Sequence, residues 1–132
     1  MQINEQNYVD EAEKVILKLI EKSPKDKFGN PTKIVTTSKL RNLLAMSADI
    51  YNEVLNQEGD KLNEDICARI EYLRVRFLYE AGREPSVKNL VNEAQIIDLL
   101  KRVNASKKNF ILFNRYMEAL VAFRKFHVTN DD

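Results

Sequence analysis

Apolar residues recur every three to four positions in five segments of this chain, which is the spacing that places them on one face of an α-helix. In residues 8–22 these positions are Val9, Ala12, Val15, Ile16, Leu19 and Ile20. The other segments with this pattern are residues 38–57, 64–81, 85–102 and 107–126. The chain has only three glycines and three prolines in 132 residues, so little interrupts the helices. The pattern predicts an all-α fold, a compact five-helix bundle with short connections.

Residues that favour helix ends flank these segments. Asn7 and Asn63 suit the N-cap position before the first and third helices, because their side chains can accept a bond from a free backbone amide. Pro24 follows the first segment and prevents its continuation. Gly82 is a natural stop for the third helix, and Pro85 suits the first turn of the fourth.

The length of the chain predicts one helical domain spanning residues 1–132, large enough to bury a core without disulfides. We expect this core to cover about residues 8–126. Residues 23–36, "SPKDKFGNPTKIVT", form a long irregular loop with two prolines and three lysines, and residues 127–132 should fray as a C-terminal tail. Cys67 is the only cysteine, and its place in an apolar-patterned helix predicts a buried thiol.

The N-terminus "MQINEQNYVDEAEK" has no basic region followed by an apolar run, so we expect no signal peptide. No apolar stretch approaches the ~20 residues that span a membrane. We therefore expect a cytoplasmic protein without a membrane partner.

The residues needed for catalysis are scarce. The only histidine, the most common acid–base group at neutral pH, is His127 in the expected tail. Asp49 and Glu53 could share a helix face, but no histidine supports them as metal ligands. The glycines are isolated and form no phosphate-binding loop. We predict no enzyme activity, no catalytic residue, no metal and no cofactor.

The third helical segment carries a stripe of arginines and tyrosines. Arg69, Tyr72, Arg76, Tyr79 and Arg83 fall within one arc of about 80° at ~100° per residue. The arginines would stand ~10 Å apart along the helix. A planar guanidinium can donate two hydrogen bonds to one phosphate, and tyrosines can stack on bases.

The alternative is that this stripe is the solvated rim of a packed helix. Glu80 lies four residues after Arg76 and could pair with it. Tyr72 and Tyr79 would then be half-buried packing residues. On either interpretation, Arg74 points to the other side of the helix, toward Glu71 and Leu78.

Charge is unevenly distributed along the chain. The net charge is only +1, which argues against a freestanding nucleic-acid binder. Residues 23–46 have a net charge of +4 and residues 47–65 a net charge of −5. Such a chain can present a basic face to one partner and an acidic face to another.

Three segments together resemble a known family. They are "TTSKLRNLL" (36–44), "YLRVRFLYEAGR" (72–83) and "RYMEALVAFRKF" (115–126). In this order, in an all-helical chain of this size, they look like the small subunit of type III-A CRISPR–Cas (Csm) effector complexes. The resemblance covers about residues 8–126.

The resemblance implies a non-catalytic helical subunit that stacks in several copies along the guide RNA and the backbone subunits. It would hold target RNA against the guide through the sugar-phosphate backbone, in antiviral defence. The implied partners are guide RNA, target RNA, the backbone and large subunits, and further copies of the chain itself. Cleavage would belong to other subunits.

The RNA-binding residues that the resemblance implies are the cations of these segments: Lys39, Arg41, Arg74, Arg76, Arg83 and Arg115. Arg69 joins them only through its place in the arginine stripe. Arg74 and Arg115 are equally consistent with structural or inter-subunit anchors.

Two other functions compete with RNA binding. One is a purely architectural adaptor whose cations contact acidic protein surfaces. The other is a helix-turn-helix DNA binder, which the acidic connection "NQEGDKLN" disfavours, since it suits no tight turn.

Overall fold

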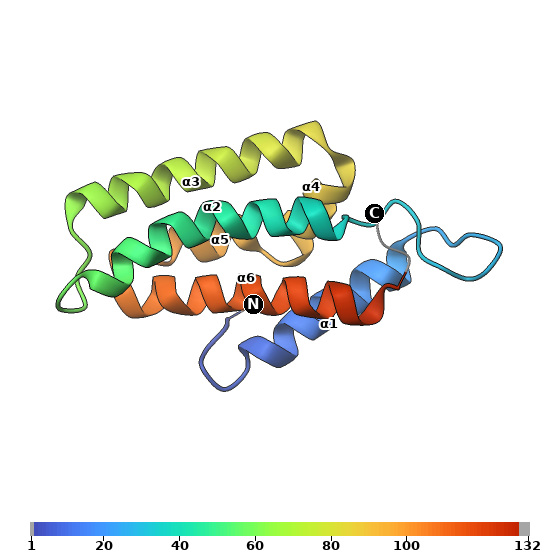
Figure 1. The fold of residues 1–132 in the computed structure, drawn as a ribbon, viewed down its shortest axis with the longest axis horizontal. Helices are drawn as coiled ribbons and strands as arrows, with labels where there is room; N and C mark the ends of the chain where they lie inside the picture. Colours follow the sequence, from blue (N-terminus) through green and yellow to red (C-terminus); the bar gives the residue numbers. More distant parts are fainter. Residues whose placement is uncertain (1, 130–132) are drawn as a thin grey trace.

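The computed structural model describes residues 2–129, and the helices in this range form an elongated bundle (Figure 1). The six helices are α1 (Tyr8–Lys22), α2 (Thr37–Asn56), α3 (Glu64–Arg83), α4 (Pro85–Glu93), α5 (Ile96–Lys101) and α6 (Lys107–His127). The predicted all-α class is confirmed. The predicted count of five helices is wrong by one.

The extra helix arises at Gln95. We expected one helix over residues 85–102, but Gln95 adopts the left-handed conformation (φ 54°) and separates α4 from α5. A residue in this conformation cannot continue an α-helical hydrogen-bond ladder. Both short helices bury their apolar residues in the same core, so the apolar spacing continues across the break. Neither glycine nor proline marks the position, so the pattern gave no sign of it.

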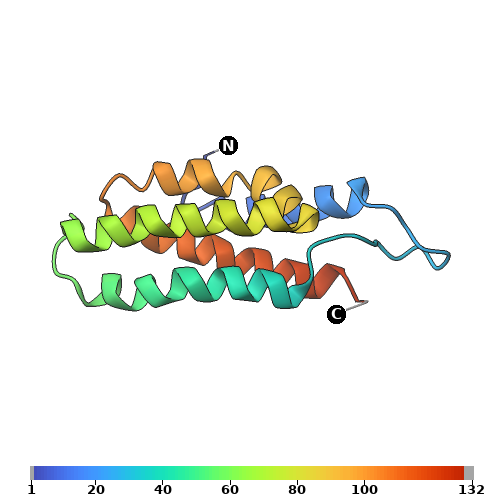
Figure 2. The same ribbon diagram turned by 90° about the horizontal axis from the view of Figure 1, so that it is seen from above.

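The long helices α2, α3 and α6 run along the length of the bundle (Figures 1 and 2). α6 packs against α1 and α2, while α3 packs against α2, α4 and α5. Three phenylalanines lie where α3 meets α6: the ring centroids of Phe77 and Phe113 are 6.4 Å apart, and those of Phe110 and Phe113 are 6.0 Å apart. Tilted aromatic packing of this kind adds to the apolar area that the core buries.

Polar groups inside the bundle are hydrogen-bonded across helices. The Ser47 hydroxyl of α2 donates to the Asn114 side-chain oxygen of α6 at 2.7 Å. The Tyr116 hydroxyl donates to the backbone oxygen of Ala94 at 3.1 Å, and burial raises the pKa of this tyrosine above its usual range. These pairs satisfy groups that would otherwise lose their hydrogen bonds to water.

The helix ends partly follow the sequence signals. The Asn63 side chain accepts from the Ile66 amide at 2.8 Å, which confirms it as the N-cap of α3. Asn7 precedes α1 but makes no side-chain cap bond. Gly82 lies inside α3, which ends at Arg83 and not at the predicted glycine stop.

The irregular loop and the last residues differ in how they pack. The loop between α1 and α2 projects beyond one end of the bundle, and the turn between α2 and α3 lies at the opposite end (Figures 1 and 2). α6 continues to His127, and Val128 is buried, so the packed region extends past the expected limit at residue 126. The end of the expected tail, residues 130–132, lies outside the described residues.

Candidate nucleic-acid interface

The arginine–tyrosine stripe lies on α3, with its rings exposed. The side chains of Tyr72 and Tyr79 are each 61% exposed, so neither is the half-buried packing residue of the alternative interpretation. The Arg83 guanidinium lies 5.6 Å from the centre of the Tyr79 ring. Rings this accessible can stack on bases or guanidinium planes.

Three of the predicted arginines are held in ion pairs on the surface of the bundle. Arg74 donates to Glu71 through Nε (3.1 Å) and Nη2 (2.7 Å), as its predicted orientation implied. Arg83 pairs with Glu80 at 3.3 Å, so the predicted pairing of Glu80 with Arg76 is wrong.

The third pair joins two helices. Arg69 of α3 contacts Glu53 of α2. The Arg69 guanidinium, which we predicted to contact phosphate, is therefore already paired with a carboxylate of the same chain.

Lys39 is also paired, through a contact between distant parts of the chain. Its Nζ lies 2.8 Å from the Glu84 carboxylate, which follows α3. The hydrogen bond and positive charge of Lys39 hold the pKa of Glu84 below its ordinary value. Both side chains remain partly exposed, so the pair is accessible to a competing anion.

The remaining three predicted cations are exposed and have no carboxylate partner within residues 2–129. They are Arg41 on α2, Arg76 on α3 and Arg115 on α6. A guanidinium without an internal partner keeps all its donors for an external anion. The structure does not gather these three side chains in one pocket.

Arg76 lines a groove of about 390 Å³ between α2 and α3, which we call the α2–α3 groove. Its lining residues are Met46, Asp49, Ile50, Asp65, Ala68, Arg69, Tyr72, Leu73 and Arg76. Two carboxylates, Asp49 and Asp65, share the groove with Arg69 and Arg76. The part of the stripe from Arg69 to Arg76 therefore lies beside side chains of both charges.

Arg115 lines a different hollow, beside the start of α6. Lys107 and Lys108 line it too, together with the carboxylates of Glu5 and Asp60. The Asp60 carboxylate accepts from the Lys108 amide at 3.1 Å, and the Lys107 ammonium contacts the Gln57 carbonyl. The Lys107 ammonium and the Lys108 amide, at the N-terminal end of α6, therefore already have partners within the chain.

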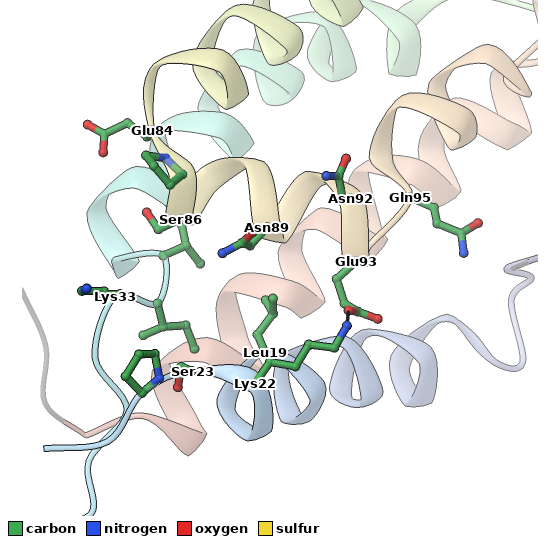
Figure 3. A pocket seen from close by; sticks show the side chains of 14 residues that line it. Leu19, Lys22, Ser23, Lys33, Glu84, Ser86, Asn89, Asn92, Glu93 and Gln95 are labelled. Carbon is green, nitrogen blue, oxygen red and sulfur yellow. Dashed lines mark hydrogen bonds and ion pairs between the residues drawn. The ribbon is translucent and has the colours of Figure 1, made fainter.

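A larger cleft, of about 870 Å³, lies between the end of α1, the loop after it and α4 (Figure 3). Ser86 and Asn89 line it, and an ion pair of 2.8 Å between Lys22 and Glu93 crosses one side. None of the seven predicted cations lines this cleft. Sequence reasoning missed it because its walls come from three separate segments.

The described residues hold no group of three or more His, Cys, Asp and Glu side chains that could bind a metal ion. His127 contacts the Glu13 carboxylate at 2.7 Å and stacks on Phe123. None of the helices in residues 2–129 combines the length and apolarity that a membrane span requires.

Comparison with known proteins identifies the family of the chain. A family model described as "Csm2 Type III-A" matches residues 12–130. A "CRISPR system Cms protein Csm2" from Streptococcus thermophilus is 40% identical over 129 residues, which cover 98% of each chain. A protein of the same name from Enterococcus italicus is 41% identical over 100 residues, covering 74% of this chain and 71% of the relative.

A third relative has a lower sequence identity to this chain. The "CRISPR system Cms protein Csm2" of Mycobacterium tuberculosis is 35% identical over 126 residues, or 96% of this chain and 95% of that protein. With the family model covering most of its length and these relatives aligning along it, the chain belongs to the Csm2 family of type III-A CRISPR systems.

Proposed function

We propose that this chain is a non-catalytic small subunit of a type III-A CRISPR effector complex in the cytoplasm. Several copies stack along the guide RNA and the backbone subunits and hold target RNA against the guide. The chain contacts the sugar-phosphate backbone and leaves sequence recognition to base pairing. Membership of the Csm2 family supports the assignment, and the exposed arginines without carboxylate partners carry the RNA contact.

Arg41, Arg76 and Arg115 are the strongest candidates for phosphate contacts. Each has an exposed guanidinium that needs no internal ion pair to be broken before it binds an anion. The four paired cations, Lys39, Arg69, Arg74 and Arg83, come next, because the carboxylate partner of each lies at the surface. A surface ion pair is worth only about 0–1 kcal/mol, so a phosphate can compete for these cations.

The net charge of +1 does not oppose this role. Copies aligned on one particle bind the same RNA at a high effective concentration, so weak contacts from each copy add to strong retention. Contacts to phosphate also suit a complex that must hold any target paired with its guide.

The test is target-RNA binding by a reconstituted complex whose small subunits carry Arg41→Glu, Arg76→Glu and Arg115→Glu. We expect the complex to assemble and to bind RNA more weakly. We also expect the slope of log affinity against log salt to fall by roughly 0.7–0.9 for each phosphate that the variant no longer binds. The matched control is Arg102→Glu, because Arg102 is paired with Asp98 at 2.5 Å and lies outside the predicted set. Equal affinity and slope in the triple variant and the control would contradict RNA contact by these arginines.

The architectural adaptor remains the second candidate, since α3 exposes an apolar surface. Tyr72, Val75, Leu78 and Tyr79 are all more than half exposed. Such a patch favours contact with another protein. Crosslinking of the assembled complex to target RNA separates the two functions, because an adaptor would give no crosslink to this chain.

A further inference from the structure

The loop between α1 and α2 presents an exposed phenylalanine at its tip. Phe28 is 77% exposed, and the loop projects past the end of the bundle (Figures 1 and 2). Lys27 lies over the Phe28 ring, with its Nζ 5.1 Å from the ring centre. The tip therefore combines one large apolar group with one cation.

Hydrogen bonds close this loop into a defined turn. The Asp26 carboxylate accepts from the amides of Phe28 (2.8 Å) and Asn30 (2.9 Å). The Asp26 amide donates to the Asn30 carbonyl at 2.9 Å. At the base, the Thr32 amide and hydroxyl both donate to the Pro24 carbonyl, at 2.7 and 3.0 Å.

The turn is therefore ordered before any partner binds. The Asn30 amide is the main cause that lowers the pKa of Asp26, so the carboxylate that closes the turn stays ionised at neutral pH. Gly29 has a φ of +83°, which a residue with a side chain rarely adopts. A preformed contact loop loses little conformational entropy on binding.

The α2–α3 groove has the complementary properties. Its floor is apolar, formed by residues that include Ile50 and Leu73, and Tyr72 forms an exposed aromatic wall. Asp49 and Asp65 in the groove have no cationic partner within residues 2–129. Its volume of about 390 Å³ can admit an aromatic side chain.

The two connections that flank α2 differ in charge. Residues 24–36 at the projecting end hold three lysines and one aspartate, whereas residues 57–65 at the opposite end hold four carboxylates and one lysine. The α2–α3 groove reaches that acidic end through Asp65, the second residue of α3. Within the groove, Asp49 and Asp65 favour a basic loop over RNA, whereas Arg76, which also lines it, favours an anion.

We infer that the Phe28 loop of one copy docks in the α2–α3 groove of the next copy, with Phe28 against the apolar floor and Lys27 beside Asp49 and Asp65. The inference rests on the proposed stacking of copies, and it identifies the two surfaces that would contact each other between neighbouring copies. The two surfaces differ, so the contact is head-to-tail and can repeat along a filament. Arg76 lies 11 residues after Asp65 along α3 and stays available to RNA.

The first experiment places a photoreactive benzoylphenylalanine at position 28 in the assembled complex. We expect a crosslink between two copies of this chain, mapping to residues 46–76. A crosslink to RNA, to another subunit or to a different region of this chain would overturn the inference, as would the absence of any crosslink.

The second experiment measures association between copies by sedimentation of the purified chain and by the number of copies retained in the complex. Phe28→Ala should weaken association at least about tenfold, as truncation of an aromatic anchor does. The control is Phe126→Ala, because Phe126 is 76% exposed on α6 and belongs neither to the loop nor to the lining of the groove. Equal effects of the two variants would contradict the docking.

A charge swap tests the proposed ion pairs. Lys27→Glu alone, or Asp49→Lys with Asp65→Lys, should weaken association about two- to fivefold. All three changes in one chain should restore it, because each loop then meets a groove of opposite charge. Additive losses would overturn the pairing.

These outcomes separate the inference from the proposed RNA contact. The crosslink at position 28 should persist without RNA and in the Arg115→Glu chain, which is changed outside the groove. Absence of the crosslink with normal RNA binding would refute the docking alone. A normal crosslink with unchanged RNA binding in the triple arginine variant would refute the RNA contact alone.

Discussion

The Nε of Arg124 donates a hydrogen bond of 2.7 Å to the carbonyl oxygen of Val35, although 89 positions separate the two residues. Arg124 is only 2% exposed, and its Nη1 donates to the Val128 carbonyl at 3.4 Å. These bonds join Val35, at the end of the long loop, and Val128, directly after α6, to the last part of α6. An arginine within the third recognised segment therefore has a structural role, while Arg115 of the same segment faces solvent.

We predict that Arg124→Met lowers the free energy of unfolding by about 1–3 kcal/mol. The change removes a charged donor from a buried carbonyl, and an unsatisfied buried acceptor costs about that much. Urea denaturation of the purified chain measures the effect. Arg115→Met on the same helix is the control and should change stability by no more than about 0.5 kcal/mol, because its side chain is exposed. Similar losses in both variants would contradict a structural role for the Arg124 bonds.

A second prediction concerns the Arg69–Glu53 pair between α3 and α2. Glu53→Gln should release the guanidinium and raise the affinity of the complex for target RNA by about two- to fivefold, the range expected when a surface ion pair no longer competes. The salt dependence of binding should become steeper at the same time. Glu118→Gln, which removes an equal charge from an exposed position on α6, is the control. No difference between the two variants would exclude Arg69 from the RNA contact.

The Lys39–Glu84 pair leads to a prediction about pH. Lys39→Met should raise the pKa of Glu84 toward its ordinary value of 4.5, because the hydrogen bond and the positive charge of Lys39 lower it. In the wild-type chain the pKa is lower folded than unfolded. The pair therefore stabilises the fold above about pH 4.5, and this contribution is lost as pH falls through the lowered pKa. Carboxyl NMR titration measures the pKa of Glu84 in the wild-type chain and in the variant. An unchanged pKa in the variant would contradict the pairing.

The connection before α6 gives a prediction about backbone strain. Ala105 has a φ of 60°, a left-handed conformation that an alanine side chain disfavours, and its carbonyl accepts from the Leu62 amide at 2.8 Å. Ala105→Gly should raise the free energy of unfolding by about 0.5–1 kcal/mol, because glycine adopts this conformation without the steric cost. Ala122→Gly, inside α6, should instead lower it by about 1 kcal/mol. Thermal unfolding compares the two, and destabilisation by Ala105→Gly would show that the conformation is not strained.

Much of the architecture could be predicted because it depends on neighbours within one or two helical turns. The apolar spacing located the long helices, and the Asn63 cap was visible next to the segment it caps. The break at Gln95 was not visible, because both α4 and α5 bury their apolar residues in one core and no helix-breaking residue separates them.

The candidate site could be predicted only as a set of cations. Helical geometry placed Arg69, Arg76 and Arg83 on one stretch of α3, and the structure retains that placement. It could not show that Arg69 contacts a carboxylate on another helix, or that Glu80 pairs with Arg83 and leaves Arg76 without a carboxylate partner among the described residues.

The sequence by itself determined the helical class, the main helix positions, the division of charge and the resemblance to a family, since each depends on residue order alone. Only the tertiary structure decided which cations remain available and which have a carboxylate partner on another part of the chain. The physical reason is range: helix periodicity acts over three or four residues, whereas ion pairs such as Lys39–Glu84 join residues 45 positions apart that meet only when the helices pack.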